Sequence, residues 1–282
     1  MEYIILGHVN VDVDSIVSGY LLEKIMTKKG YKASFVIPDE EVAKESEDLC
    51  SKYDLSLYQF KNRQLKDDAK YILVDHNVRD VPGEIVAVID HHPVLDGEKK
   101  DNYYIEEASS TACMIAMDNE EYLNKHDIEL ACLATFVDTA SFHSTKTRKS
   151  DISWINEMCT KYEFDYDKLY VDGLCLTSLK DVDEILFNGF KEYEFDNFIV
   201  HSSYIQVADK NKSNEVVDAI IDKLKDYMND KKIDLYVFIV YDMSSFYTKV
   251  YEISKDGIDT SEYNLYASRG NTVIPDIKKK YC

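Results

Sequence analysis

The side chains best suited to metal chemistry lie near the N-terminus, where His8, Asp12 and Asp14 fall within seven residues. One imidazole and two carboxylates are a ligand set for a divalent metal. Because one small apolar residue separates Asp12 from Asp14, the two carboxylates can point towards different metals. The segment also fits a simpler interpretation, an Asp-rich helix N-cap beside a surface histidine. It therefore predicts a metal site only with support from elsewhere in the chain.

Two apolar runs further along the chain end in acidic and imidazole side chains. Residues 71–74 and 85–89 are followed directly by Asp75, His76, Asp90, His91 and His92. Burying such groups unpaired costs several kcal/mol each, and a bound metal is the simplest compensation. A further carboxylate, Asp138, ends the apolar run 131–137 and would by itself be an ordinary helix cap. Taken together, these groups predict a metal centre of carboxylates and imidazoles.

The apolar pattern of the first half indicates which elements position these groups. It predicts strands at residues 3–6, 33–37, 71–74 and 85–89, and helices at 16–26, 40–49, 111–117 and 127–136. Alternation of this kind is typical of an α/β domain with a doubly wound, mainly parallel sheet. In such sheets ligands bind at the carboxyl ends of the strands, where the candidate ligands stand.

The second half predicts a smaller α/β domain. Periodicity is lost over residues 171–180, which we interpret as a linker. Beyond it the pattern predicts helices at 182–190 and 214–228 and strands at 198–207, 233–241 and 246–253. We therefore expect two domains, 1–174, which contains the candidate metal ligands, and 178–282, with a site in the cleft between them.

The motifs occur in the order found in the DHH phosphoesterases. They are His8-x-Asn10-x-Asp12-x-Asp14-Ser15, Val74-Asp75-His76-Asn77, Asp90-His91-His92 and Val137-Asp138-Thr139. The whole chain most resembles the family II, manganese-dependent inorganic pyrophosphatases and their exopolyphosphatase relatives. Three further segments are similar to motifs of that family, and the C-terminal part resembles its DHHA2-like domain. These segments are Ser110-Thr111-Ala112, Phe190-Lys191-Glu192-Tyr193 and Ser268-Arg269.

The resemblance implies a role for each matching residue. One metal would be held by His8, Asp12, Asp75 and Asp138, and the other by Asp14, Asp75, His91 and Asp138. Asp75 and Asp138 would thus bridge the two metals and be catalytic, together with His92, Lys191 and Arg269, which would contact substrate phosphates. Asp90 and His76 would orient the ligand imidazoles. The implied cofactors are two divalent ions, manganese with cobalt or magnesium as alternatives, and a further magnesium carried by the substrate.

The implied reaction is metal-dependent hydrolysis of a phosphoanhydride bond, inorganic pyrophosphate to two phosphates, by a hydroxide that bridges the metals. Exopolyphosphatase action on short polyphosphates is the first alternative, followed by a small-nucleotide phosphodiesterase and a catalytically silent phosphate sensor. The chain departs from the family at Val11 (usually Pro) and Gly189 (usually Asp). Gly270 and Asn271 stand where the pyrophosphatases carry two lysines. One phosphate-binding cation is therefore missing, which leaves the substrate open.

Composition limits the partners and the cellular location that we expect for this protein. A formal charge of −20 disfavours nucleic acid and anionic membranes as general partners. The partner that the resemblance implies is a small phosphate anion, whose site must be made locally positive by metals, Lys or Arg. The N-terminus lacks the pattern of a signal peptide, and the longest apolar run, residues 130–137, is too short for a bilayer. We expect a cytoplasmic protein, with the oligomeric state, a homodimer included, left open. The six scattered cysteines, without a CxxC, favour reduced thiols.

Overall fold

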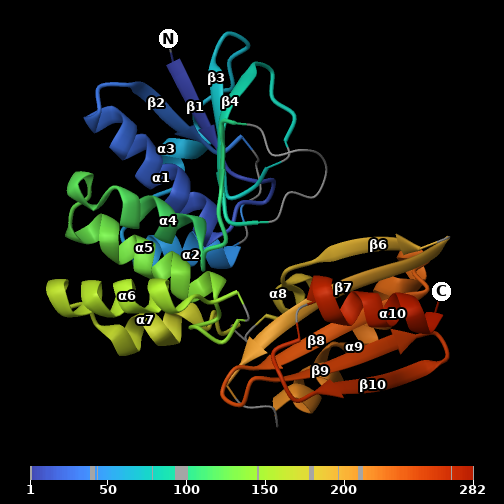
Figure 1. The fold of residues 1–282 in the computed structure, drawn as a ribbon. Helices are drawn as coiled ribbons and strands as arrows, with labels where there is room; N and C mark the ends of the chain where they lie inside the picture. The colour runs from blue at the N-terminus through green and yellow to red at the C-terminus, as the bar shows by residue number, and fades with distance from the viewer. Residues whose placement is uncertain are drawn as a thin grey trace. The chain divides into compact units, whose positions relative to one another are not determined.

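The structure, a computed structural model, describes residues 2–38, 42, 44–77, 79–92, 101–144, 146–177, 181–195, 197–208, 212–267 and 269–281. The chain divides into two compact units, Met1–Leu174 and Cys175–Cys282, each of which contains a sheet and helices (Figure 1). Each unit has its own apolar core. No helix among the described residues is long and apolar enough to cross a membrane.

The first unit contains a five-stranded sheet in the order β2-β1-β3-β4-β5. Its strands are β1 (Glu2–Leu6), β2 (Lys32–Val36), β3 (Lys70–Val74), β4 (Glu84–Asp90) and β5 (Tyr103–Ile105). All four neighbouring pairs are parallel. The predicted α/β class with a parallel sheet is confirmed, and the short β5 is an addition that its three residues were too few to signal.

Seven α-helices belong to this unit in the part of the chain that the structure describes. They are α1 (Val13–Lys28), α2 (Lys44–Lys52), α3 (Tyr58–Lys61), α4 (Thr111–Asp118), α5 (Lys125–Asp138), α6 (Lys149–Tyr162) and α7 (Tyr166–Gly173). Figure 1 shows α1, α4 and α5 on one side of the sheet, where they pack on Ile5, Ile72 and Val74. The alternate residues Ile4 and Leu73 belong to a second cluster on the opposite face.

Several helices of the first unit differ from the sequence prediction, which lacked α3, α6 and α7. Helix α6 was not predicted, although its buried residues Trp154, Ile155 and Met158 follow a helical spacing. Helix α7 continues to Gly173, so the predicted linker at 171–180 is wrong for its first three residues. Gly173 marks a close contact rather than a break, because a Cβ there would lie 2.5 Å from Cβ of Phe136.

The second unit is a mixed sheet in the order β10-β9-β8-β7-β6. Its strands are β6 (Lys191–Phe195), β7 (Phe198–Val207), β8 (Leu235–Asp242), β9 (Tyr247–Ser254) and β10 (Gly257–Tyr263), and its helices are α8 (Val182–Phe187), α9 (Lys212–Lys231) and α10 (Ile274–Tyr281). Among the described strands β7 and β8 pair in parallel, and the other three neighbouring pairs are antiparallel. The three predicted strands are present, whereas the edge strands β6 and β10 are new. Both edge strands are largely exposed, so they lack the apolar alternation that reveals a half-buried strand.

Candidate metal centre

The order of the strands brings three motifs to one edge of the first sheet. β1, β3 and β4 are consecutive neighbours, and their carboxyl ends lead into the segments of His8, Asp75 and His91. The turn after β1 is tight at Gly7, where a Cβ would lie 2.3 Å from Oγ of Ser15. Asp12 then caps α1 by accepting a hydrogen bond from the Ser15 N–H at 3.0 Å. This cap directs the His8–Asp14 segment over the strand ends.

The first ligand group consists of His8, Asp12 and Asp75, whose candidate ligand atoms all lie within 4.8 Å of one another. Nε2 of His8 is 3.4 Å from Oδ2 of Asp12 and 3.7 Å from Oδ2 of Asp75. Burial acts to lower the pKa of His8, but the hydrogen bond and charge of Asp12, with the charge of Asp14, raise it to about 9. A cation is therefore favoured at this position, whether a proton or a metal ion.

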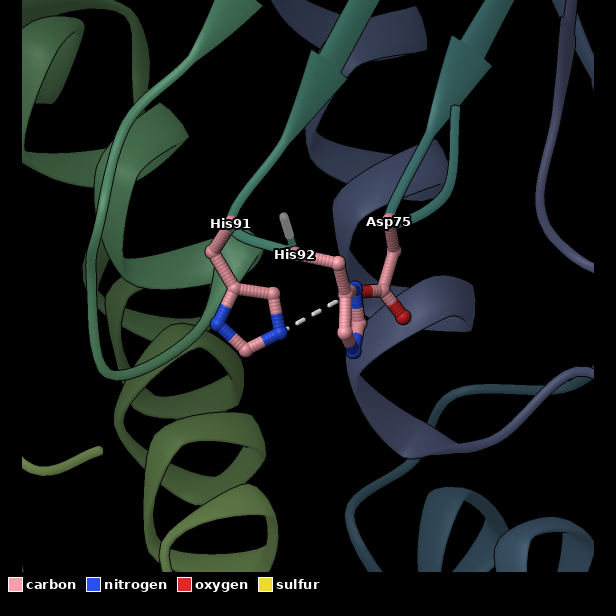
Figure 2. A group of neighbouring side chains, drawn as sticks. All are labelled: Asp75, His91 and His92. Atoms are coloured by element: carbon pink, nitrogen blue, oxygen red, sulfur yellow. Dashed lines mark ion pairs between the residues drawn. The ribbon is translucent and has the colours of Figure 1, made fainter. Parts of the chain in front are cut away.

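The second ligand group consists of Asp14, His91 and Asp138, with the same 4.8 Å limit between ligand atoms. Nε2 of His91 lies 3.9 Å from Oδ2 of Asp14, 3.4 Å from Oδ1 of Asp75 and 3.4 Å from Oδ2 of Asp138. Figure 2 shows the His91 ring directed at the carboxylate of Asp75. Asp75 thus contacts both histidines and joins the two groups.

Backbone carbonyls orient both imidazoles for metal binding. Nδ1 of His8 is 2.8 Å from the Val9 carbonyl, and Nδ1 of His91 is 3.0 Å from the Ala108 carbonyl. When Nδ1 donates to a carbonyl, Nε2 carries the lone pair that ligates a metal. Among the described residues none forms a hydrogen bond with Nε2 of His91, although this atom is buried. A divalent ion would satisfy it, so the residues present fit a metal centre.

Each of the buried carboxylates is fixed by hydrogen bonds. Asp14 accepts the backbone N–H groups of Thr111 and Ala112, at 2.8 and 2.9 Å, at the positive N-terminal end of α4. Asp75 has a left-handed backbone conformation, with φ of 62°, and accepts a hydrogen bond from the Thr111 hydroxyl at 3.1 Å. These contacts hold the carboxylates in place before a metal binds.

The clustered negative charges make the metal-free site unfavourable. Burial, reinforced by the charges of Asp14, Asp12 and Asp138, raises the pKa of Asp75 well above its ordinary value. Burial also raises the pKa of Asp138, which is the last residue of α5. A carboxylate at a helix C-terminus faces the negative end of the helix dipole. Divalent cations are the natural compensation for such a cluster.

His92 and Asp90 form a pair beside the metal ligands. Asp90 is fully buried and lies 2.9 Å from Nδ1 of His92 through Oδ1, while its other oxygen accepts from the Asn77 amide. This hydrogen bond raises the pKa of His92, whose side chain is half-exposed. The resemblance implied that Asp90 orients the ligand imidazoles, whereas in the structure Asp90 contacts and orients His92. His76 contacts the His8 ring edge-on, and burial lowers the pKa of His76 to about 4.

The predicted phosphate contacts Lys191 and Arg269 belong to the second unit. The sequence predicted a helix up to residue 190, but α8 ends at Phe187. Lys191 is the first residue of β6 and is exposed. Arg269 donates to the carbonyl of Gly189 and stacks on the Tyr204 ring. Gly189 has φ of +57°, and a Cβ there would lie 2.1 Å from the same ring. The absence of a side chain at residue 189 is therefore required by packing. The predicted cleft between the units remains a prediction.

One charged neighbour of the cluster was missed from the sequence. Nζ of Lys146 lies 2.5 Å from Oδ2 of Asp138, eight residues earlier. Lys146 follows α5 in an irregular segment, where no periodicity indicates which way a side chain points. The backbone conformation of that segment brings the ammonium group of Lys146 next to the metal ligand Asp138.

Known proteins similar to this chain share its fold over nearly the whole length. A model of the DHH family, N-terminal domain, matches residues 2–137. A probable manganese-dependent inorganic pyrophosphatase of Oceanobacillus iheyensis is 25% identical, covering 86% of this chain and 83% of that protein. A manganese-dependent inorganic pyrophosphatase of Methanocaldococcus jannaschii is 23% identical, covering 100% of this chain and 99% of that protein.

Two solved structures extend the comparison of the fold. The crystal structure of a putative family II inorganic pyrophosphatase of Methanococcus jannaschii has a TM-score of 0.70 at 20% identity and covers 99% of both chains. An exopolyphosphatase-related protein of Bacteroides fragilis has a TM-score of 0.52 at 16% identity, covering 99% of this chain and 92% of that chain.

Proposed function

We propose that the protein, whose residues 2–137 match a model of the DHH family, hydrolyses the phosphoanhydride bond of inorganic pyrophosphate with two divalent ions, manganese foremost. The observation that carries the proposal is the pair of His/Asp groups joined at Asp75, with Nε2 of His91 buried beside three carboxylates. Relatives that cover most of the chain are named manganese-dependent inorganic pyrophosphatases. Ligands of carboxylate and imidazole without thiolate suit manganese, cobalt or magnesium.

The first unit, residues 1–174 in our proposal, has the task of holding two cations close together. His8 and Asp12 would hold one ion, Asp14 and His91 the other, and Asp75 and Asp138 would contribute to both. When bound, two such ions neutralise phosphate oxygens and lower the pKa of a water for attack on phosphorus. His92, whose pKa is raised by its hydrogen bond with Asp90, would donate a hydrogen bond to a phosphate oxygen.

The second unit, residues 178–282 in our proposal, supplies cations for the phosphate groups. Arg269 is fixed by the Gly189 carbonyl and the Tyr204 ring. Gly189 lies two residues before Lys191 in the chain. Both side chains therefore start from one region of this unit. A guanidinium and an ammonium group there would stabilise the charge that develops on the leaving phosphate. A magnesium ion carried by the substrate would offset the rest.

The test is phosphate release from pyrophosphate, tripolyphosphate, long polyphosphate and a dinucleotide, each with manganese, with magnesium and with excess chelator. We expect manganese-dependent release that is fastest with pyrophosphate and absent in chelator. Full activity in chelator, or release from the dinucleotide alone, would refute the proposal. Metal analysis of the active protein should find two ions per chain.

A second candidate is an exopolyphosphatase that removes terminal phosphate from short polyphosphates. The observation that favours it is Gly270, which is exposed and has no atom of the described residues within 4 Å of a would-be Cβ. Open space without a cation would tolerate a longer leaving group. We rank pyrophosphate first because the metal ligands act directly on the reacting atoms, whereas magnesium can replace a peripheral cation.

The setting follows from the same proposal. A small phosphate anion is the partner, and we propose a cytoplasmic location. A homodimer is the assembly to test, by light scattering coupled to gel filtration.

A further inference from the structure

The segment that follows α5 is folded back on the end of that helix. Three successive residues, Ala140, Ser141 and Phe142, have φ values of 46°, 53° and 72°, the left-handed region that side chains disfavour. Their conformation is held by hydrogen bonds from the Ser141 N–H to the Phe136 carbonyl at 2.7 Å and from the Ser144 N–H to the Thr139 carbonyl at 2.9 Å. The Ser141 hydroxyl donates to the Tyr170 carbonyl at 2.6 Å. The fold-back is thus fixed at several points.

This conformation places the ammonium group of Lys146 on a metal-ligand oxygen. Nζ lies 2.5 Å from Oδ2 of Asp138, and the same oxygen is 3.4 Å from Nε2 of His91. Lys146 therefore provides positive charge at a position that the second ligand group offers to a divalent ion. A metal ion on that oxygen would repel the ammonium group, so the two compete for Asp138.

The ammonium group of Lys146 can move away from Asp138 when a metal binds, because it lies on the solvent side of the cluster. The Lys146 side chain is 36% exposed, whereas those of His91 and Asp75 are 2% and 1% exposed. His92, which follows the ligand His91 in the chain, is also accessible to solvent, with a side chain that is 49% exposed. The Lys146 charge acts on it, so the two groups are within electrostatic reach. An ammonium group and an imidazole that both reach solvent can donate hydrogen bonds to an anion.

We propose that Lys146 is a phosphate-binding residue of the first unit, which pairs with Asp138 in the metal-free protein and turns to a substrate phosphate once divalent ions occupy the carboxylates. This inference rests on the proposed function for the identity of the anion. Two divalent ions balance the charges of Asp12, Asp14, Asp75 and Asp138. The several negative charges of a diphosphate then require protein cations, and Lys146 is already at the site.

The experiment measures binding of methylenediphosphonate, a diphosphate that cannot be hydrolysed at its bridging atom, to the manganese-loaded protein by calorimetry. Lys146→Gln should weaken binding about tenfold or more, the scale for losing a charged phosphate contact. Lys146→Arg should recover most of it, because the charge is kept. Lys149→Gln is the matched control, since Lys149 is exposed at the start of α6 and its loss changes the net charge equally. It should bind like the wild type.

Manganese titration without any phosphate provides a second readout. Removing the competing ammonium should tighten manganese binding by about two- to fivefold in Lys146→Gln, the range of an exposed ion pair. Lys149→Gln should leave manganese affinity unchanged. A purely structural role would instead weaken manganese and diphosphonate binding together and lower the melting temperature.

The outcomes separate this inference from the proposed function. Diphosphonate affinity within twofold of the wild type in Lys146→Gln overturns the inference, even if manganese binding tightens. So does equal weakening in Lys149→Gln, or failure of Lys146→Arg to recover affinity. Lack of manganese-dependent phosphate release by the wild type refutes the proposed function alone, because the binding measurement requires no turnover.

Discussion

Oδ1 of Asp75 lies 3.4 Å from Nε2 of His91, between two strand ends that are neighbours in the sheet, and both side chains are almost completely buried. Asp75 also faces His8 through its other oxygen, at 3.7 Å. One carboxylate is therefore shared by both candidate ligand groups. The strongest consequences of a substitution are expected at this residue.

Asp75→Asn should lower kcat by more than about a hundredfold with manganese. Partners that only orient a ligand already cost about 10–100-fold when removed, and Asp75 faces both metals. In excess chelator the same variant should melt about 2–4 °C above the wild type, because one of several repelling buried charges is gone. Phosphate release and calorimetric melting check both effects. Wild-type turnover, or a lower melting temperature in chelator, would contradict the interpretation.

Arg269→Ala and Lys191→Ala should each lower kcat/KM for pyrophosphate about a hundredfold, as expected for losing a charge partner of the transition state. Manganese content should not change, because neither residue is a proposed ligand. Arg269→Lys is the control for Arg269, since it keeps the charge but not the planar group that stacks on Tyr204. Loss of metal in either alanine variant would argue against the assigned role.

Gly270→Lys should raise kcat/KM for pyrophosphate selectively over tripolyphosphate, by about three- to tenfold, if the missing cation limits grip on the leaving phosphate. The substitution is sterically permitted by the part of the chain that the structure describes, in which no atom lies within 4 Å of the added Cβ. Gly270→Met provides a side chain of similar length without charge. Equal gains in both variants, or a gain with tripolyphosphate only, would exclude a charge effect on pyrophosphate.

The second unit should show a pH-dependent contribution from Asp242 at the end of β8. Burial acts to raise the pKa of Asp242, but hydrogen bonds from Ser245 and Ser244 outweigh it and hold the pKa below the ordinary 3.8. Because the folded-state pKa is lowered, this contribution is fully present above the unfolded-state pKa and is lost as the pH falls through the folded-state value. Asp242→Asn should therefore cost about 1 kcal/mol at pH 7.

Urea unfolding of the wild type and Asp242→Asn at pH 7 and near pH 3 measures this contribution. The difference in the free energy of unfolding between them should shrink at the lower pH. Ser254→Ala, at the end of β9, is a control whose effect should not follow that pH dependence, because its hydroxyl donates to the Gly257 carbonyl and accepts from the Asp256 N–H, both backbone groups. A difference that stays constant with pH would show that Asp242 stabilises the unit by packing rather than by charge.

The sequence alone determined the nature of the site and most of the elements around it. Continuous apolar runs such as residues 71–74 are recognisable because a strand buried on both faces contains little else. The Asp and His residues that follow them are conspicuous because buried ionisable groups need compensation. Helices that are buried on most sides, such as α5, were recognised because they too contain a nearly continuous apolar run. Edge strands β6 and β10 were missed because exposed strands impose no such pattern.

Only the tertiary structure decided which of these residues meet. Local periodicity describes neighbours along the chain, whereas the proximity of His8 to Asp75 depends on β1 lying beside β3. Backbone carbonyls as partners of the imidazoles have no sequence signature at all, since every residue carries one. Lys146 reaches Asp138 through three consecutive left-handed residues that are not glycine. Hydrogen bonds with Phe136 and Tyr170 stabilise that conformation, so the position of this cation is a property of the folded chain.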